Sequence, residues 1–258
     1  MIKNVRATVR LILFFITTLL TIVFVAVGNF LLGPVGRRWH IAWKNKVIKA
    51  WAWLVSWIIG LQVDLKGTPP DPPFLLVSNH LSYIDPLLFW RYLDATFVAK
   101  SEVKSWPFFG WGTKTLGVLF IDRELRKDVK RMNERISSSI SNVQGVIIFP
   151  EGTSTKGKDV KSFNAPLLQY PVDNQMPVHY VSISYKTPNP WPAHMHVCWW
   201  GDMAFMSHFW NLLKIPRFKA KVIFGESIIE RDRKILADRL HRAVSSSFMP
   251  VVKEKEIQ

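Results

Sequence analysis

The sequence contains a single cysteine, Cys198, among 258 residues. A disulfide within the chain is therefore excluded, which fits a reducing compartment without proving one. Cys198 lies in the apolar run His196–Trp200, which is typical of a buried strand. We therefore interpret it as a buried structural residue rather than a nucleophile.

Acidic residues are scarce near the N-terminus. Residues 1–70 contain nine Lys and Arg but one acid, Asp64, so they hold over half of the formal net charge of +15. Positive charge beside apolar sequence favours an anionic membrane surface as the partner. The sequence contains no RNA- or DNA-binding motif, so we expect no nucleic-acid partner.

Charged residues are absent from Leu11 to Leu32, a run of 22 residues. As a helix it would reach roughly 33 Å, near the ~30 Å thickness of the hydrocarbon core. The alternative is a cleaved signal peptide, but its apolar region would be ~7–15 residues long and followed by a cleavage site. We favour a retained anchor.

A second apolar segment, Ala50–Leu61, carries Trp51, Trp53 and Trp57. It is short for a membrane span, and its tryptophans suit the membrane interface. Both flanks of the first run are basic, so charge does not orient it, and our hypothesis is a hairpin of two helices dipping into one leaflet. We expect residues 1–63 to anchor the chain at a membrane, on the cytoplasmic face of a bacterial inner membrane.

A Pro-, Gly- and Asp-rich stretch at Asp64–Pro73 predicts a linker, after which short apolar runs alternate with helical patterns. This alternation predicts one α/β domain over residues 64–258, with a mixed, partly parallel sheet of about seven strands flanked by helices. The expected strands are Phe74–Ser78, Thr96–Ala99, Val118–Ile121, Val146–Phe149, Val178–Ser184, Met195–Trp199 and Lys221–Gly225. The expected helices are Pro86–Tyr92, Glu124–Asn142, Phe205–Leu213 and Glu230–Phe248.

A first polar cluster, Ser78–Pro86, directly follows an apolar strand, where α/β sheets place ligand-handling residues. Pro86 suits the first position of a helix with Asp85 as its N-cap. A short loop can bring His80 onto the Asp85 carboxylate and leave the other ring nitrogen as a base. A lone His-x4-Asp is more often a capping aspartate beside a packed histidine, and no further ligands at metal spacing lie nearby.

Three further clusters follow later strands. Leu119–Arg123 ends in an Arg123 that can hold a phosphate or simply pair with a neighbouring acid. Ile148–Ser154 offers a glycine for close approach and two hydroxyls, although alone it could be an ordinary turn. Val178–Tyr185 is more typical of a core strand than of a site.

Taken together, in this order and at these intervals, the motifs resemble the glycerolipid acyltransferase family, whose best-known members are 1-acyl-glycerol-3-phosphate acyltransferases. The resemblance covers roughly Asp64–Glu226, and the N-terminal hydrophobic pair is similar as well. Its four blocks are met at His80–Asp85 (the HX4D motif), Phe120–Arg123, Phe149–Ser154 and Pro177–Ser184, with additional similarity at Lys100–Val103, Trp106–Gly110 and Trp200–Met203.

The resemblance implies an O-acyltransferase in which His80 is the general base and Asp85 orients it. His80 would take the proton of a lysolipid hydroxyl, which attacks an acyl thioester, so the reaction needs no cofactor and no metal. The donor would be acyl-CoA or acyl-carrier protein. By the same resemblance, the acceptor site is shaped by Arg123, Glu151, Gly152, Thr153 and Ser154, with Asn79 and Ser82 as supporting loop residues.

One position departs from the family pattern. Many members that use 1-acyl-glycerol-3-phosphate carry Arg after Glu-Gly-Thr, where this chain has Ser154. The missing cation weakens the case for a phosphomonoester, although Lys156 and Lys158 lie nearby. We expect 1-acyl-glycerol-3-phosphate as the acceptor, giving phosphatidic acid, with another lysolipid such as lyso-ornithine lipid as the alternative. Rivals of a different class are a thioester hydrolase and a non-enzymatic membrane scaffold.

Overall fold

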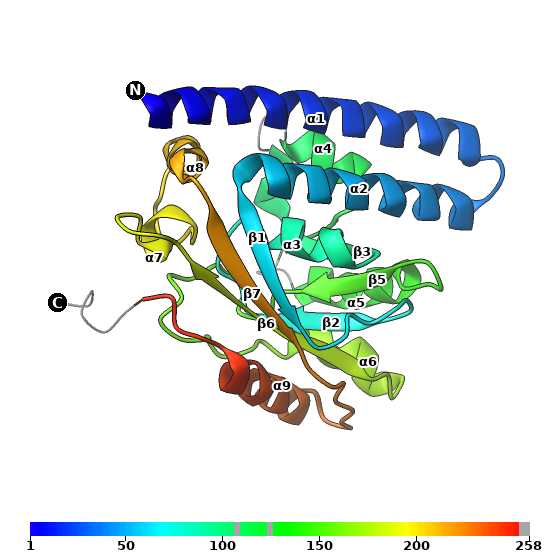
Figure 1. The fold of residues 1–258 in the computed structure, drawn as a ribbon. Coiled ribbons are helices and arrows are strands. Elements are labelled where there is room, and N and C mark those ends of the chain that lie inside the picture. The colour runs from blue at the N-terminus through cyan, green and yellow to red at the C-terminus, as the bar shows by residue number, and fades with distance from the viewer. Residues whose placement is uncertain (106–108, 123–125, 253–258) are drawn as a thin grey trace.

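The structure is a computed structural model that describes residues 1–105, 109–122 and 126–252. Its centre is a seven-stranded sheet in the order β1-β7-β6-β2-β5-β3-β4 (Figure 1). Only β6 and β7 pair antiparallel among these neighbours. The mixed, largely parallel sheet is thus confirmed. The strands are β1 (Leu61–Lys66), β2 (Leu75–Ser78), β3 (Ala95–Lys100), β4 (Leu119–Ile121), β5 (Gly145–Ile148), β6 (Val178–Lys186) and β7 (Phe218–Phe224).

Helices cover both faces of the sheet and extend beyond it on one side (Figure 1). The longer helices are α1 (Ile2–Leu32), α2 (Arg37–Ile59), α3 (Asp85–Tyr92), α5 (Arg126–Ser139), α8 (Phe205–Lys214) and α9 (Arg233–Ser247). The shorter ones are η1 (Ser101–Ser105), α4 (Phe109–Thr115), η2 (Pro166–Leu168), α6 (Gln169–Asp173) and α7 (Ala193–His196).

The central strands are apolar on both sides because helices pack on both sides. In β2, Leu76 faces the core beneath α2, α3 and α8, while Leu75 and Val77 face the core beneath α5 and α9. In β5, Ile147 belongs to the first of these cores, and its two neighbours belong to the second. This is why these strands appear in the sequence as continuous apolar runs rather than alternating ones.

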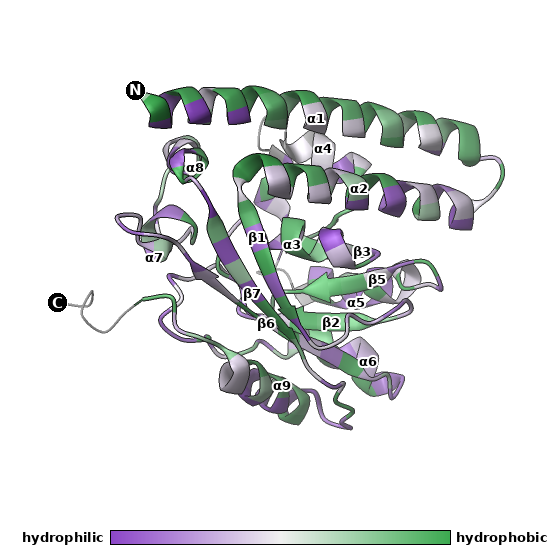
Figure 2. Cartoon of the chain, viewed as in Figure 1, coloured by the Kyte–Doolittle hydropathy of each residue, from purple (hydrophilic) through white to green (hydrophobic). Residues whose placement is uncertain are grey.

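Two long antiparallel helices, α1 and α2, lie along one side of the domain (Figure 1). Figure 2 shows α1 as hydrophobic over most of its length. Within the described residues, it is the one helix long and apolar enough to cross a membrane by length and composition, yet only 22% of its most apolar window is buried. Gly28 allows α1 and α2 to approach each other closely, because a Cβ at this position would meet the Trp43 ring at 1.9 Å.

Two expectations about the elements were wrong. Met195–Trp199 is not a strand, since Ala193–His196 forms a short helix and the following residues are buried in a loop. Apolar character alone does not separate a strand from other buried segments in so short a run. Conversely, the first three residues of the predicted linker, Asp64–Lys66, belong to a strand, because Leu61–Lys66 pairs with β7.

The carboxyl ends of the parallel strands lie along one edge of the sheet. The loop after β2 begins at Asn79, the loop after β5 begins at Phe149, and β3 ends at Lys100. Edges of this kind are where open α/β sheets bind ligands. The sequence clusters therefore meet in space although they lie far apart in the chain.

Candidate active site

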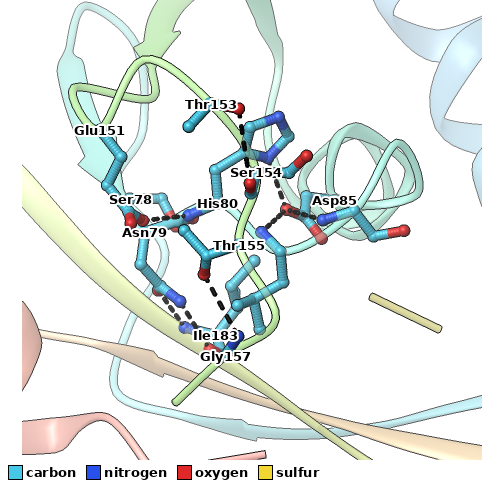
Figure 3. A network of polar contacts seen from close by, with 12 residues as sticks. Ser78, Asn79, His80, Asp85, Glu151, Thr153, Ser154, Thr155, Gly157 and Ile183 are labelled. Carbon is cyan, nitrogen blue, oxygen red and sulfur yellow. Dashed lines mark hydrogen bonds and ion pairs between the residues drawn. The ribbon is translucent and has the colours of Figure 1, made fainter. Parts of the chain in front are cut away.

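The loop between β2 and α3 holds His80 against Asp85. The distance from His80 Nδ1 to Asp85 Oδ2 is 2.7 Å, and the carboxylate is fully buried. The backbone N–H groups of Leu81 and Ser82 donate to the same oxygen at 2.7 and 3.0 Å. Three hydrogen bonds thus converge on one carboxylate oxygen, and Figure 3 shows His80 and Asp85 facing each other.

Asp85 does not have the capping role predicted for it. It is the first residue of α3, Ile84 occupies the N-cap position, and no side chain caps the helix. Pro86 does occupy the first turn as expected. The carboxylate instead points back into the preceding loop, where it accepts hydrogen bonds from that loop and from His80.

The His80 ring presents its second nitrogen to a cavity. A carboxylate only accepts hydrogen bonds, so Nδ1 carries the proton and Nε2 of the neutral ring keeps a lone pair. The ring stacks on Phe149, with centroids 4.1 Å apart and planes at 20°. The side chain is 22% exposed and lines the cavity. This geometry suits a general base.

Backbone and side-chain bonds fix the rest of the loop. Asn79 bonds to Ile183 of β6 in both directions: its Nδ2 donates to the carbonyl at 2.9 Å and its Oδ1 accepts from the N–H at 2.8 Å. The amide side chain therefore continues the β2–β6 ladder by one step after the backbone has turned away. Thr155 N donates to the His80 carbonyl at 3.0 Å. Asn79 thus fixes the start of the loop against β6.

Glu151 lies behind His80 rather than in the cavity. Its Oε1 accepts from His80 N at 2.6 Å (Figure 3), and its Oε2 accepts from Lys161 N at 2.9 Å. Burial raises the pKa of Glu151 to about 7, outweighing the two backbone hydrogen bonds that lower it. The carboxylate does not line the cavity. Glu151 therefore holds the backbone of His80 in place. The resemblance had implied instead that Glu151 contacts the acceptor substrate.

The cavity beside His80 has a volume of about 480 Å³. Its apolar wall is aromatic and includes Trp90, Phe97 and Phe149, and the loop that begins at Phe149 also contributes Gly152, Thr153 and Ser154. Gly152 has a φ of +80°, a backbone conformation that glycine adopts without strain. In the described part of the chain, the charged residues that line this cavity are Lys100 and Glu102. Arg123, predicted for the acceptor site, lies outside the described residues.

A second cavity, of about 180 Å³ and mostly apolar, adjoins the first. Tyr83, Pro86 and Trp90 line both, together with Thr113 and Phe205. The second cavity is also lined by α1 and α2, through Phe14, Ile22, Trp51 and Val55. The two cavities therefore share part of their wall, and the second reaches the helical pair.

Two tyrosines that the sequence patterns did not single out belong to the surroundings of His80 and Asp85: Tyr83 lies in the same loop, and Tyr185 lies on β6. Tyr83 lies within 2.9 Å of His208 Nδ1, whose Nε2 lies 2.9 Å from the Cys198 carbonyl. Tyr185 of β6 donates to Asp85 Oδ1 at 2.7 Å. Cys198 itself is fully buried, and burial raises the pKa of its thiol, as expected of a structural cysteine. Among the described residues, no group of three or more His, Cys, Asp or Glu side chains is arranged to hold a metal ion.

The sequence of this chain matches a known protein family and several individual proteins. Residues 62–184 match the family model described as Acyltransferase. The chain is 30% identical to the lyso-ornithine lipid O-acyltransferase of Pseudomonas aeruginosa over 203 residues, covering 78% of each protein. This chain belongs to the acyltransferase family. It is an O-acyltransferase that acts on lysolipids.

Other members of the family are similar along most of the chain. The 1-acyl-sn-glycerol-3-phosphate acyltransferase of Neisseria gonorrhoeae is 28% identical, over 72% of this chain and 73% of that protein. The crystal structure of the 1-acyl-sn-glycerophosphate acyltransferase PlsC from Thermotoga maritima has a TM-score of 0.60 at 22% identity, covering 92% of this chain and 97% of that one. The second likeness confirms the fold.

Proposed function

We propose that His80 Nε2 takes the proton from the hydroxyl of a bound lysolipid, and that the resulting oxygen attacks an acyl thioester. A tetrahedral intermediate forms, the C–S bond breaks, and the proton leaves with the thiol. General base catalysis of this kind accounts for ~10²–10⁴ in rate. The observation that supports it is the His80–Asp85 contact of 2.7 Å at the wall of a cavity.

The tetrahedral oxyanion needs hydrogen-bond donors. The N–H groups of His80, Leu81 and Ser82 are all bonded to carboxylates, and that of Gly152 is bonded to the Phe149 carbonyl. Thr153 and Ser154 line the cavity with His80 and offer their backbone N–H groups and the Ser154 hydroxyl as donors, whereas the Thr153 hydroxyl donates to the Ser154 carbonyl at 3.4 Å. We assign the oxyanion contact to that loop.

For the acceptor we propose lyso-ornithine lipid. An ornithine head group joined through one amine carries a carboxylate and a free ammonium. The cavity wall has one partner for each charge, Lys100 and Glu102, and a neutral Ser154 where a phosphate-binding Arg would stand. The matched relatives include lyso-ornithine lipid O-acyltransferases from three further organisms at 26–29% identity. A zwitterionic head group suits this wall better than a dianionic one.

The second candidate acceptor is 1-acyl-glycerol-3-phosphate, and one observation favours it. The Lys156 ammonium lies 5.8 Å from the centre of the Trp200 ring, and Trp200 lines the cavity. A short movement of this lysine would bring a cation to a bound phosphate. The donor in either case is an acyl thioester, acyl-CoA or acyl-carrier protein, and the chemistry at His80 is the same for both.

We infer that α1 and α2 hold the enzyme on one leaflet of a membrane. Although α1 is long enough to span, Arg6 and Arg10 near its start bond to carbonyls at the end of α8. Toward its other end, Trp43 of α2 donates to the Phe24 carbonyl. A helix held alongside the domain at both ends suits lying in the interface, with its exposed apolar residues in lipid. The proposed membrane is the bacterial inner membrane, on its cytoplasmic face.

A transfer assay with purified enzyme tests the acceptor. The acceptors are lyso-ornithine lipid and 1-acyl-glycerol-3-phosphate in matched detergent micelles, each with acyl-CoA and with acyl-carrier protein. We expect kcat/KM to be at least tenfold higher for lyso-ornithine lipid. A preference of the same size for the phosphate would reverse the acceptor assignment and leave the acyl-transfer chemistry standing.

The same assay separates the rival classes. Thiol release that is equally fast without any lysolipid would indicate a thioester hydrolase, because water would then replace the acceptor. If no acceptor supports thiol release, the result would favour the non-enzymatic membrane scaffold. His80-dependent release that requires the lysolipid supports the proposal.

A further inference from the structure

The Asp85 carboxylate is more completely bonded than a histidine partner requires. It is fully buried, and its Oδ2 accepts from His80 Nδ1 and from two backbone N–H groups. The other oxygen, Oδ1, accepts from the Tyr185 hydroxyl at 2.7 Å. A buried carboxylate is stable only when its oxygens are paired. Tyr185 is the partner that the described structure gives to Oδ1.

The difference in length between two strands brings Tyr185 to this position. β2 ends at Ser78, which pairs with Val181, whereas β6 continues to Lys186. Tyr185 therefore lies four residues, or roughly 13 Å, beyond the end of β2. The loop that leaves β2 folds back over this extension of β6. Because side chains alternate along a strand, Tyr185 shares a face with Val181 and Ile183, and this face packs against the core beneath α3.

The Tyr185 hydroxyl is a constant donor. The side chain is 4% exposed and its ring lies 6.4 Å from that of Phe218. Burial, together with the neighbouring Asp85, raises the pKa of Tyr185 well above its ordinary value. The phenol therefore keeps its proton throughout the range in which the enzyme can work. A water molecule at the same place would exchange and rotate, whereas the tyrosine is fixed by its ring.

We propose that Tyr185 is a positioning residue for the reaction, which acts on His80 through Asp85. This inference rests on the proposed role of His80. By binding Oδ1, the hydroxyl fixes the plane of the carboxylate so that Oδ2 faces His80 Nδ1. It also withdraws negative charge from the carboxylate, which limits how tightly a protonated imidazole is held. Tyr185 thus tunes both the orientation of the base and the ease with which it returns its proton to the leaving thiol.

The test compares Tyr185→Phe with a matched control on the same strand. Tyr180→Phe makes the same change in β6, but on the opposite face, where Tyr180 packs against the core beneath α9. For Tyr185→Phe we expect kcat to fall about tenfold, the size of one lost hydrogen bond to a charged group, with both KM values within twofold of wild type. The control should match wild type in every constant.

The pH profile distinguishes positioning from simple structural support. Removing the phenol leaves more negative charge on Asp85 for the imidazolium, so the acid limb of kcat/KM should move to higher pH, by about 0.5 unit. The other titratable groups that influence this carboxylate or its tyrosine are Glu151, Tyr83 and Cys198, and each is unchanged between the variant and wild type. A more acidic fluorotyrosine at position 185 keeps the shape and donates more strongly, so it should move the limb to lower pH.

The outcomes are separable. Unchanged kcat and an unmoved acid limb in Tyr185→Phe would overturn the inference, and so would a lower melting temperature with neither kinetic change. If Tyr185→Phe does not fold, the fluorotyrosine protein decides, because an acid limb that stays in place then refutes the role. Full turnover by His80→Ala would instead refute the base assignment, and with it the foundation of the inference.

Discussion

The loops at Asn79–Asp85 and Gly152–Ser154 lie on the same edge of the sheet but are built in opposite ways. In the first loop, side chain and backbone bond to buried partners on β6 and to Glu151. In the second, Thr153 is exposed and Ser154 is partly exposed, and both line the cavity. The first loop is fixed and carries the proposed base, while the second is open and lines the cavity. Chemistry and acceptor choice are therefore expected to vary independently.

Removing the proposed base should have the largest effect of all the changes considered. We expect His80→Ala to lower kcat by about 10²–10⁴-fold, because the acceptor hydroxyl then has no group to take its proton. The melting temperature should change little, since the ring is at the cavity wall rather than in the core. Steady-state transfer and thermal unfolding of the same preparation measure the two effects. Turnover within tenfold of wild type would refute the role.

The next effect concerns how the fixed loop is held. Asn79→Ala leaves the N–H and C=O of Ile183 without their side-chain partners in a buried position. Each unsatisfied group costs about 1–3 kcal/mol, so we expect a loss of about 3 kcal/mol in the free energy of unfolding. Urea unfolding in detergent measures it. Stability equal to wild type would show that the bonds between Asn79 and Ile183 of β6 do not hold the loop in place.

The open loop should change selectivity without disturbing the base. Ser154→Arg places a cation where a phosphate acceptor would need it, and a charge-assisted bond contributes about 1.5–3 kcal/mol. We expect kcat/KM for 1-acyl-glycerol-3-phosphate to rise at least tenfold and that for lyso-ornithine lipid to fall. Ser154→Thr is the matched control and should keep the wild-type ratio. An arginine variant that loses both activities equally would argue against an acceptor role for this position.

The last effect is a pH dependence of stability at the contact between the two loops. Burial raises the pKa of Glu151 to about 7 in the folded protein, above its ordinary value of 4.5. The folded state therefore binds this proton more tightly than the unfolded state, so the contribution of Glu151 to stability falls as pH rises from about 4.5 to 7. The slope is at most about 1.4 kcal/mol per pH unit.

The matched variant is Glu151→Gln, which carries no titrating group and should lack this slope. Unfolding free energies at pH 5 and pH 7 for both proteins provide the measurement. If the difference between the two pH values is the same in both proteins, Glu151 does not titrate in this range.

The α/β class, the apolar strands and the loop that carries His80 and Asp85 could be predicted from the sequence, because these features depend on periodicity and on residues within a few positions of one another. His80 and Asp85 are five residues apart, so a single turn can join them. Six of the seven expected strands also occur in the sheet. The short run at Met195–Trp199 failed because burial, and not strand formation, explains its apolar residues.

The residues that surround that pair come together only when the chain folds. Tyr185 reaches Asp85 across 100 positions, and Glu151 reaches the His80 backbone across 71. Such contacts depend on strand order and on how far β6 extends past β2, and no local pattern encodes either. The same holds for α1, whose composition alone fits a membrane span. Its contacts with α2 and α8 arise from residues up to 208 positions away.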